Sequence, residues 1–344
     1  MNNTTILQNH THSNPFNEDA HVAYKDTLER GMLIVSMVIY SLAFVLGVLG
    51  NGLVIVITGF CMKRTVNTVW FLNLAIADFI FTFFLPLSIV YTARDFDWPL
   101  GEAMCKINSS LAFFNLYASV YLLMVISVDR CLSVRCPVWA RNHRTPQLAY
   151  LVALVVWVLA LALSSPNFYF RGTSQSRFHD KIVLVCTGNY GPTKEHQQFT
   201  LKAMTISRFI FGFAIPFSVI VFCYGAIVLK LRSTHLAPSS KPLKIITAVI
   251  VAFFVCWFPY HVFAFLELNE HGTPLVVIGS ILTTSLAYLN SCLNPILYVF
   301  MGHDFKEKLR RSLRTVLEHA FLEESNLSTT NTKVIPSTEL ELLS

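Results

Sequence analysis

The sequence predicts an all-α membrane protein whose body is a seven-transmembrane helix bundle. Of its 344 residues, 54% are hydrophobic and only 13% are charged, which is about half the charged fraction of a soluble domain. Seven apolar stretches are long enough to cross a bilayer as helices, and they run approximately over residues 31–60, 68–92, 103–134, 147–166, 200–229, 243–266 and 275–300. No stretch shows the strand-length alternation of a membrane β-barrel, so every crossing is expected to be helical.

The charged residues between these stretches predict how the bundle is oriented. Basic residues follow the first, third, fifth and seventh stretches: Lys63, Arg64, Arg135, Arg141, Arg144, Lys230, Arg232, Lys241, Lys244, Lys306, Lys308, Arg310, Arg311 and Arg314. The alternate segments carry the acids Asp95, Asp97, Glu102, Asp180, Glu195, Glu267 and Glu270. The positive-inside rule therefore places the N-terminus outside and the C-terminus in the cytoplasm. The net charge of +6 fits contact with anionic lipid and not with nucleic acid.

The polar tail of residues 1–30 fits an extracellular location. Asn2, Asn3 and Asn9 each begin an N-x-S/T triplet, which is a glycosylation acceptor on that side of the membrane. The tail has no signal-peptide pattern, so the first apolar stretch is expected to act as its own insertion signal.

Cysteine placement predicts one disulfide. Cys61, Cys131 and Cys136 fall on the cytoplasmic side, and Cys223, Cys256 and Cys292 fall inside the apolar stretches. Only Cys105 and Cys186 face the oxidising side, so we expect a Cys105–Cys186 bond that pins the 167–199 loop across the mouth of the bundle.

Asp78 lies in the middle of the apolar run from Val69 to Val90. A carboxylate at that depth costs several kcal/mol unless it is paired, which favours a functional role over that of a protonated packing residue. Asn115 and Ser119 lie one helical turn apart on span three, as do Asn290 and Asn294 on span seven, and Asn51 lies between two glycines of span one. With Asp78 these residues could form one cluster near mid-membrane. One acid among neutral oxygens suits a small cation such as Na⁺. The alternative is a structural hydrogen-bond network between helices.

Prolines in three of the stretches predict movable parts. Pro259 in Cys256-Trp257-Phe258-Pro259 kinks span six, Pro216 interrupts span five, and Pro295 in Asn294-Pro295-Ile296-Leu297-Tyr298 breaks span seven, so these positions could be hinges. At the inner end of span three, Asp129 and Arg130 can neutralise one another. Arg130 then faces the cytoplasmic cavity, or it extends to the lipid headgroups.

Taken in order, these residues resemble the rhodopsin-like (class A) G-protein-coupled receptors over nearly the whole chain. The matching motifs are Gly50-Asn51 with Val54, Leu74 to Asp78, Asp129-Arg130-Cys131, Trp157, Pro216 with Tyr224, Cys256 to Pro259 and Asn294 to Tyr298. Asp304-Phe305 and the basic stretch to His319 are similar to the family's short amphipathic eighth helix. The chain then divides into an extracellular tail (1–30), the bundle (31–302), a membrane-surface helix (303–319) and a cytoplasmic Ser/Thr-rich tail (320–344).

Within the family, the chain is similar to the chemoattractant receptors for chemerin, formyl peptides and prostaglandin D. The likeness is greatest to the chemerin receptors, in Met104 to Ile107, Tyr260-His261 and Leu266 to Leu268. Formyl-peptide receptors carry an acid in span three and two arginines in span five. The corresponding residues here are Phe114, Met204 and Arg208, so formyl-peptide recognition by that mechanism is not expected. No acid occurs between Lys230 and Leu266, so Arg130 has no carboxylate partner on span six.

The resemblance implies an outer ligand cavity lined by Phe113, Phe114, Tyr117, Arg171, Arg208, Tyr260, His261 and Tyr288. Aromatic walls with fixed cations suit an amphipathic ligand with an anionic end. That end could be a peptide or protein carboxylate, as in chemerin, or a lipid carboxylate of the prostaglandin D or resolvin type. We expect Arg208 to hold the anion, with extension of its side chain to the outer interface as the alternative.

The implied mechanism is a population shift in which agonist and heterotrimeric G protein favour the same state. The switch residues are Asp129, Arg130, Tyr224, Trp257, Pro259, Asn294, Pro295 and Tyr298, and the site for Na⁺, which favours the inactive state, comprises Asp78, Asn115, Ser119, Asn290 and Asn294. The expected G protein is of the inhibitory class, driving leukocyte chemotaxis or inflammatory signalling from the plasma membrane. Receptor kinases and arrestin would act on Ser325, Ser328, Thr329, Thr330, Thr332, Ser337 and Thr338.

Two other classes of protein bury acids in a membrane. An ion-coupled transporter should show internal repeats, and none is found in the sequence. An intramembrane enzyme needs a nucleophile–base or metal motif such as His-Glu-x-x-His, which is absent from the sequence, so catalysis is not expected.

Overall fold

The structure is a computed structural model that describes residues 15–178, 181–233, 241–269 and 273–301. The helices are α1 (Pro15–Val56), α2 (Val66–Ala93), α3 (Gly101–Arg135), α4 (Pro137–His143), α5 (Pro146–Phe170), α6 (Lys194–Phe209), α7 (Ile215–Ser233), α8 (Lys241–Asn269) and α9 (Pro274–Met301). Two π-helical segments, η1 (Ile57–Cys61) and η2 (Ile210–Ala214), continue α1 and join α6 to α7. The glycosylation, eighth-helix and phosphorylation predictions fall on residues outside the described ranges.

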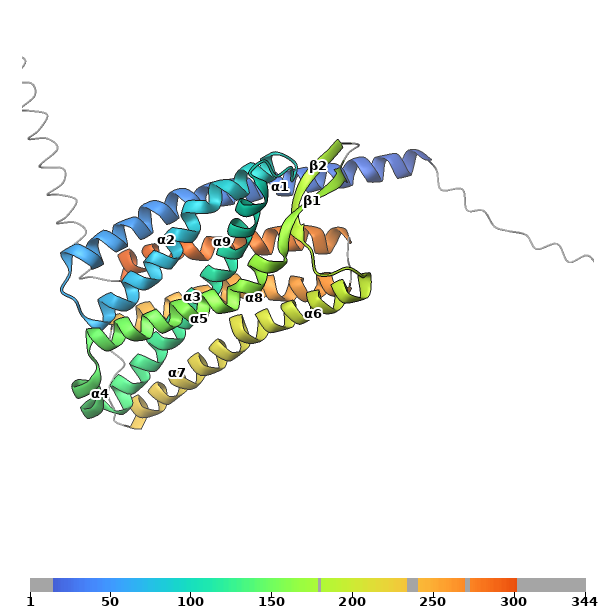
Figure 1. Ribbon diagram of the computed structural model, residues 1–344. Coiled ribbons are helices and arrows are strands. Elements are labelled where there is room, and N and C mark those ends of the chain that lie inside the picture. The colour runs from blue at the N-terminus through green and yellow to red at the C-terminus, as the bar shows by residue number, and fades with distance from the viewer. Residues whose placement is uncertain (1–14, 179–180, 234–240, 270–272, 302–344) are drawn as a thin grey trace, which may run out of the picture.

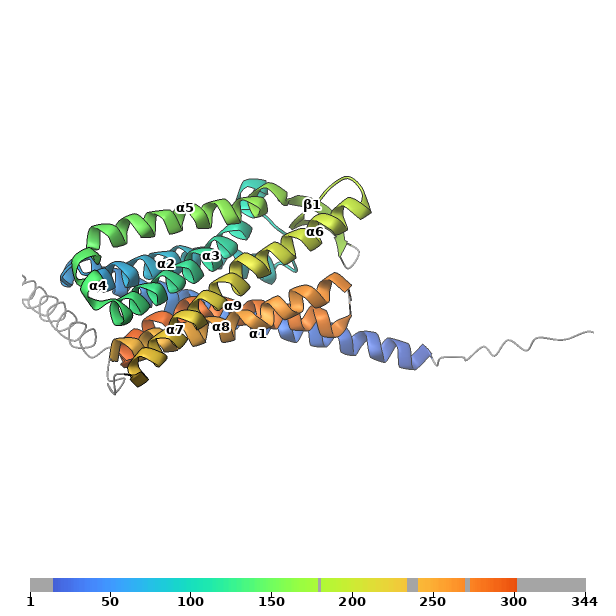
Figure 2. The same cartoon turned by 90° about the horizontal axis from the view of Figure 1, so that it is seen from below.

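The prediction of seven helical spans is confirmed. Among the described residues, seven helical segments are long and apolar enough to cross a membrane: Arg30–Cys61, Val66–Ala93, Gly101–Arg135, Pro146–Phe170, Lys194–Ser233, Ile246–Asn269 and Pro274–Ile296. Figures 1 and 2 show them as one elongated bundle with α4 at one end and the strands at the other. Several helices extend beyond the apolar stretches that predicted them, because the polar turns at their ends can remain helical outside the lipid.

Threonine side chains determine where three of the helices begin. Thr65 Oγ1 accepts from the Thr68 N–H at 3.3 Å, and Thr68 Oγ1 accepts from the Thr65 N–H at 2.8 Å. This reciprocal capping box satisfies two backbone donors at the start of α2. Thr145 caps α5 ahead of Pro146, and Thr193 caps α6 in the same way.

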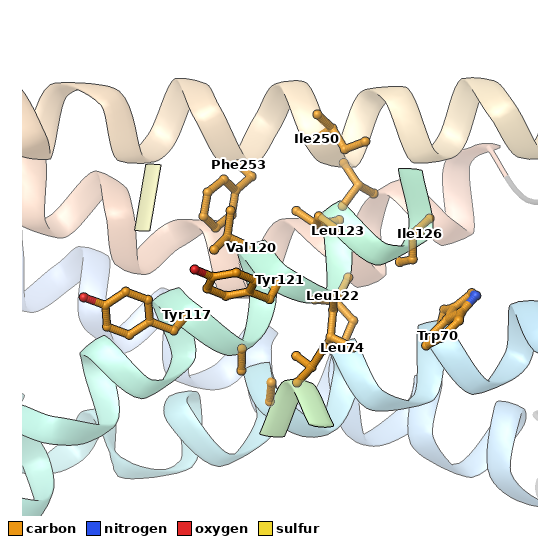
Figure 3. Packing of buried hydrophobic residues seen from close by; sticks show 14 of the residues in the cluster. Trp70, Leu74, Tyr117, Val120, Tyr121, Leu122, Leu123, Ile126, Ile250 and Phe253 are labelled. Carbon is orange, nitrogen blue, oxygen red and sulfur yellow. The ribbon is translucent and has the colours of Figure 1, made fainter. Parts of the chain in front are cut away.

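Helix α3 runs through the middle of the bundle and contacts α2, α5 and α7, while α1 packs on α2 and α9. Figure 3 shows part of the resulting core, where Leu122 and Leu123 of α3 lie between side chains of α2 and α8. Gly50 permits the close approach of α1 to α9, because a Cβ there would lie 2.9 Å from Pro295 Cβ. Gly52 is less restrictive, since its nearest neighbour would be Phe79 at 3.5 Å.

The long loop before α6 contains a hairpin that the sequence did not predict. Strand β1 (Arg171–Phe178) pairs antiparallel with β2 (Lys181–Gly188), with Thr173 opposite Cys186. The disulfide Cys105–Cys186 joins β2 to the first turn of α3. Leu184 of β2 also accepts from the Trp98 N–H at 2.7 Å and donates to Asp97 Oδ1 at 3.1 Å. The hairpin is therefore held across one end of the bundle, here called the hairpin end; the opposite one is the α4 end.

Candidate ligand-binding site and switch

A cavity of about 520 Å³ opens at the hairpin end between α1, α2, α3, α6, α8, α9 and the hairpin. This volume lies within the range of small-molecule and peptide-end sites, about 300–1,000 Å³. Five residues of the predicted ligand set line it: Phe113, Arg171, Arg208, Tyr260 and Tyr288. Trp257, predicted as a switch residue, lines it too and is buried.

Arg208 is the best-defined cation of this cavity. Its Nη1 donates to the Tyr260 hydroxyl at 2.8 Å, and its Cζ lies 3.9 Å from the centre of the Phe113 ring. A third contact, from Nη2 to Asn167 Oδ1, is long at 3.4 Å. No carboxylate among the described residues forms an ion pair with it. The guanidinium is thus held in place by neutral groups and keeps its charge available for an anion.

The cavity wall on α2, α3 and α9 is rich in hydroxyl and amide groups, which the sequence prediction missed. It comprises Ser88, Thr92, Asn108, Ser109, Ser280, Thr283 and Thr284. The Ser280 hydroxyl and the Arg171 Nε are buried without a hydrogen-bond partner among the described residues. Glu267 adds one acid. The cavity therefore combines two arginines and several aromatic rings with a set of neutral hydroxyl and amide groups.

Three residues of the predicted ligand set lie elsewhere. Phe114 points toward α5, where its ring centre is 5.5 Å from that of Trp157. Tyr117 lies one turn deeper on α3 and packs beside Gly212 of η2. His261 is buried among Phe209, Phe213 and Tyr260, with ring centres 5.2–5.7 Å away. On each helix, only one face reaches the cavity, and residue type alone does not identify that face.

A second cavity, of about 940 Å³, lies against the base of the hairpin. It shares Arg171, Thr187, Gly188 and Tyr190 with the first cavity. Its remaining wall comes from the start of α3, the end of α5, the start of β1 and the segment from Asn189 to His196. The two cavities therefore meet at the base of the hairpin.

Asp78 is completely buried, and three of its predicted partners contact it. Asn294 Nδ2 donates to Asp78 Oδ2 at 2.7 Å, and Ser119 Oγ donates to Oδ1 at 3.5 Å. Asn115, with its amide nitrogen turned to the acid, donates to Oδ1 at 3.3 Å and accepts from Ser291 Oγ at 2.8 Å. Ser291 was not predicted, although it follows the predicted Asn290. Asn51 contacts the Ser291 carbonyl at 2.8 Å instead of the acid.

The donor set of this cluster fits a small cation. The side-chain oxygens of Asn290 and Asn294 are buried and accept no hydrogen bond from the described residues, so each has lone pairs available for a hard ion. Together with the Asp78 carboxylate and the Ser119 hydroxyl, the Asn294 oxygen could hold Na⁺, whereas no hydrogen bond among the described residues joins Asn290 to Asp78. Groups of three or more His, Cys, Asp or Glu side chains that could hold a metal do not occur in the described part of the chain.

The α4 end contains an ion-pair network centred on Asp129. Arg144, between α4 and α5, donates from Nε to Asp129 Oδ1 at 2.7 Å and from Nη2 to Oδ2 at 3.0 Å. Arg130 lies farther from the same acid, with Nη2 at 3.7 Å from Oδ2. Both guanidiniums also donate to Asn67 Oδ1 at the start of α2. Asp129 is thus neutralised chiefly by Arg144, a partner the sequence did not indicate.

The remaining switch residues are distributed along α7, α8 and α9. Tyr224 of α7 packs against the main core. Pro259 and Pro295 lie inside α8 and α9 and remove a backbone donor from each. The Tyr298 side chain lies outside the described part of the structure.

Comparison with known proteins gives matches over most of the chain. Residues 50–298 match the family described as 7 transmembrane receptor (rhodopsin family). Chemerin-like receptor 1 of Rattus norvegicus is 50% identical over 307 residues, covering 85% of this chain and 82% of that receptor. Chemerin-like receptor 1 of Homo sapiens is 47% identical over 309 residues, covering 85% and 81%. N-formyl peptide receptor 3 of Homo sapiens is 40% identical over 346 residues, covering 96% and 98%.

Proposed function

Because the chain belongs to the rhodopsin family of seven-transmembrane, G-protein-coupled receptors, we propose that it is a chemoattractant receptor for a peptide or protein with an anionic end. In this proposal the hairpin end faces the extracellular space and the α4 end faces the cytoplasm. The positive-inside rule supports this orientation, since the exposed Lys63, Arg64, Arg135 and Arg141 all lie at the α4 end. The similarity to chemerin-like and formyl peptide receptors supports the chemoattractant class.

The observation that carries the ligand proposal is the Arg208 guanidinium, held by Tyr260 and Phe113 without an acidic partner among the described residues. A carboxylate reaching it would form charge-assisted hydrogen bonds with a guanidinium that is partly buried. The C-terminus of a peptide supplies such a group.

A lipid carboxylate would find the same arginine but a less suitable cavity wall. The serine, threonine and asparagine side chains on α2, α3 and α9 can hydrogen-bond a peptide backbone. Thr92, Asn108 and Thr283 already donate within the protein. A long hydrocarbon chain would leave the other groups, such as the buried Ser280 hydroxyl, without a partner, at a cost of about 1–3 kcal/mol each. This wall is the reason we favour a peptide end over a lipid mediator.

In this proposal, signal transduction depends on two coupled parts of the bundle, the bend of α8 and the cluster around Asp78. Agonist in the cavity contacts Trp257, which lies on α8 two residues before Pro259, so binding is coupled to bending of α8 at the proline. Na⁺ at Asp78 would stabilise the arrangement in which Asn294 and Ser119 remain close to the acid. Agonist and G protein favour the other arrangement, and their coupling is reciprocal. The G protein expected is of the inhibitory class.

The test compares matched ligands on matched receptors. Chemerin C-terminal peptides with a free carboxylate and with a C-terminal amide are titrated against nucleotide exchange on purified inhibitory G protein. Arg208→Ala should lower the potency of the free-acid peptide by about 10- to 150-fold, equivalent to about 1.5–3 kcal/mol for a charged hydrogen bond. The potency of the amide should fall far less.

Arg177 is an exposed arginine of β1, and Arg177→Ala is the matched control. It should leave the potency of both peptides unchanged. Equal losses for the acid and the amide would place the anion elsewhere. Exchange driven by lipid carboxylates and not by peptides would favour the lipid alternative. Exchange on another G-protein class would correct the subtype.

A further inference from the structure

Two cysteine thiols meet near the α4 end of the bundle, and the proposed ligand response uses neither of them. Cys131 belongs to α3 and Cys223 to α7. These helices pack against each other, and both run to the α4 end (Figure 1). The two thiols are close enough to share a hydrogen bond. Residues that are far apart in the sequence are therefore brought together as a pair by the packing of α3 on α7.

The two thiols differ in exposure. Cys131 is partly exposed, whereas Cys223 is buried, with only 4% of its surface exposed. A small reagent therefore reaches Cys131 more readily than Cys223. An accessible thiol next to a second thiol that can displace its oxidation product is the arrangement of a redox sensor and its resolving cysteine. On the reducing side of a membrane, the disulfides that do form are usually transient and serve sensing roles of this kind.

We propose that Cys131 and Cys223 form a reversible disulfide when the protein meets hydrogen peroxide, so that α3 and α7 become covalently joined near the α4 end. In the first step the Cys131 sulfur attacks one peroxide oxygen. An S–O bond forms, the O–O bond breaks, and the second oxygen leaves as water with the thiol proton. The product is a sulfenic acid at Cys131.

The second step uses the buried partner. The Cys223 sulfur attacks the sulfur of the sulfenic acid, an S–S bond forms and the S–O bond breaks. The hydroxyl group leaves as a second water with the proton of Cys223. The two thiols together lose two electrons, and one peroxide molecule gains them. A dithiol such as dithiothreitol reverses the reaction by thiol–disulfide exchange.

The bond would lie beside two of the predicted switch residues. Arg130 precedes Cys131, Tyr224 follows Cys223, and the Arg130 and Tyr224 side chains are close enough to interact electrostatically. A disulfide one residue away from each would fix the separation of α3 and α7 at this point. We therefore expect the oxidised receptor to be held in its resting arrangement. This consequence rests on the proposed function, whereas formation of the bond does not.

The experiment treats the full-length receptor in detergent with a small molar excess of hydrogen peroxide. Remaining thiols are blocked with N-ethylmaleimide, and the digest is mapped by mass spectrometry without reduction. The peptides that contain Cys131 and Cys223 should appear linked, and dithiothreitol should separate them. In Cys223→Ser the reaction should stop at the sulfenic acid of Cys131, which dimedone traps.

Two further variants complete the set. Cys131→Ser alters the partly exposed partner and should abolish both the linked peptide and the dimedone adduct at this position. It also keeps the test decisive if the buried Cys223→Ser does not fold. Cys136→Ser is the matched control, because Cys136 is exposed and immediately follows α3. It should leave the bond between Cys131 and Cys223 unchanged.

The effect on signalling is measured by agonist-stimulated nucleotide exchange on the same samples. Peroxide should lower the exchange rate in proportion to the linked fraction of receptor, and dithiothreitol should restore it. Cys131→Ser and Cys223→Ser, given the same two treatments, should show no such loss and recovery. Because both variants retain the Cys105–Cys186 disulfide, they also control for its reduction.

Three results would overturn the proposal. These are a bond from Cys131 to Cys136 in place of Cys223, oxidation of Cys131 to a sulfinic acid while Cys223 is present, and an undiminished exchange rate in fully linked receptor. Failure of the reduced receptor to stimulate exchange would instead contradict the proposed function. The linked peptide would then decide the redox proposal alone, since neither ligand nor G protein enters that measurement.

Discussion

Replacing Arg144 by glutamine should raise the ligand-independent activity of the receptor. Arg144 holds Asp129 through two charge-assisted hydrogen bonds of 2.7 and 3.0 Å and reaches Asn67 on α2. No acid occurs on α8 between Lys241 and Leu266, so this network is the ionic restraint on the inner end of α3. Glutamine keeps the length of the side chain approximately but removes the charge and the paired geometry.

The side chains of Asp129 and Arg144 are 11% and 26% exposed, so solvent weakens the pair only in part. We assign the pair about 1.5–3 kcal/mol, at the level of one hydrogen bond to a charged group. If the pair exists only in the resting state, its loss shifts the equilibrium by about 10- to 150-fold. A receptor that is about 1% active would then become roughly 10% active or more.

The assay is basal nucleotide exchange on purified G protein in detergent, with receptor amounts matched. Maximal agonist-stimulated exchange is recorded in parallel, and its retention shows that the variant is folded. Arg141→Gln, three residues away and exposed, should leave basal exchange at the wild-type level. Unchanged basal exchange in Arg144→Gln, with full agonist response, would refute the reasoning that the Arg144–Asp129 pair restrains the receptor.

Three further outcomes are expected. Asp78→Asn should abolish the difference in agonist affinity between sodium chloride and choline chloride, and a full sodium effect would exclude the site. Phe113→Leu should weaken agonist binding by about 2- to 30-fold through loss of the cation–π contact, whereas Phe114→Leu should lower only the midpoint temperature of unfolding. The Leu184 N–H and then Arg94 hold the pKa of Asp97 below its usual 3.8. The Asp97 tether therefore persists as the pH falls to about 4 and is lost only below that. The fluorescence of Trp98 should change across this acid transition, and that change should be absent in Asp97→Asn.

The spans could be predicted from sequence because the lipid interior requires a long run of mainly apolar side chains at every crossing. Hydropathy alone located all seven. It did not locate α4, whose seven residues are too short to show a period, or the hairpin, whose β2 strand carries the β-branched residues Ile182, Val183 and Val185 inside a loop. It also could not show η2, since a π-helical turn has no compositional signal.

The candidate site was predictable in part for a related reason. An acid in an apolar run is conspicuous, so Asp78 and its contacts with Asn115, Ser119 and Asn294 could be inferred from spacing. Arg144 was counted only as one of many basic residues in a loop. Its pairing with Asp129 depends on how α4 turns the chain back toward α3, which is a tertiary property. The hydroxyl wall of the cavity was missed because serines and threonines in a membrane helix can also bond to their own backbone.

Asn67 offers a way to observe the α4 end directly. A single amide oxygen accepts from both Arg130 and Arg144, so the rotation of that amide is fixed by two guanidiniums at once. Withdrawal of either arginine would leave the oxygen half-satisfied and change the electron density on the attached NH₂ group. A receptor labelled with ¹⁵N in asparagine side chains would therefore carry a spectroscopic reporter at this position. Its resonance would distinguish the doubly bonded state from the singly bonded one without any added probe.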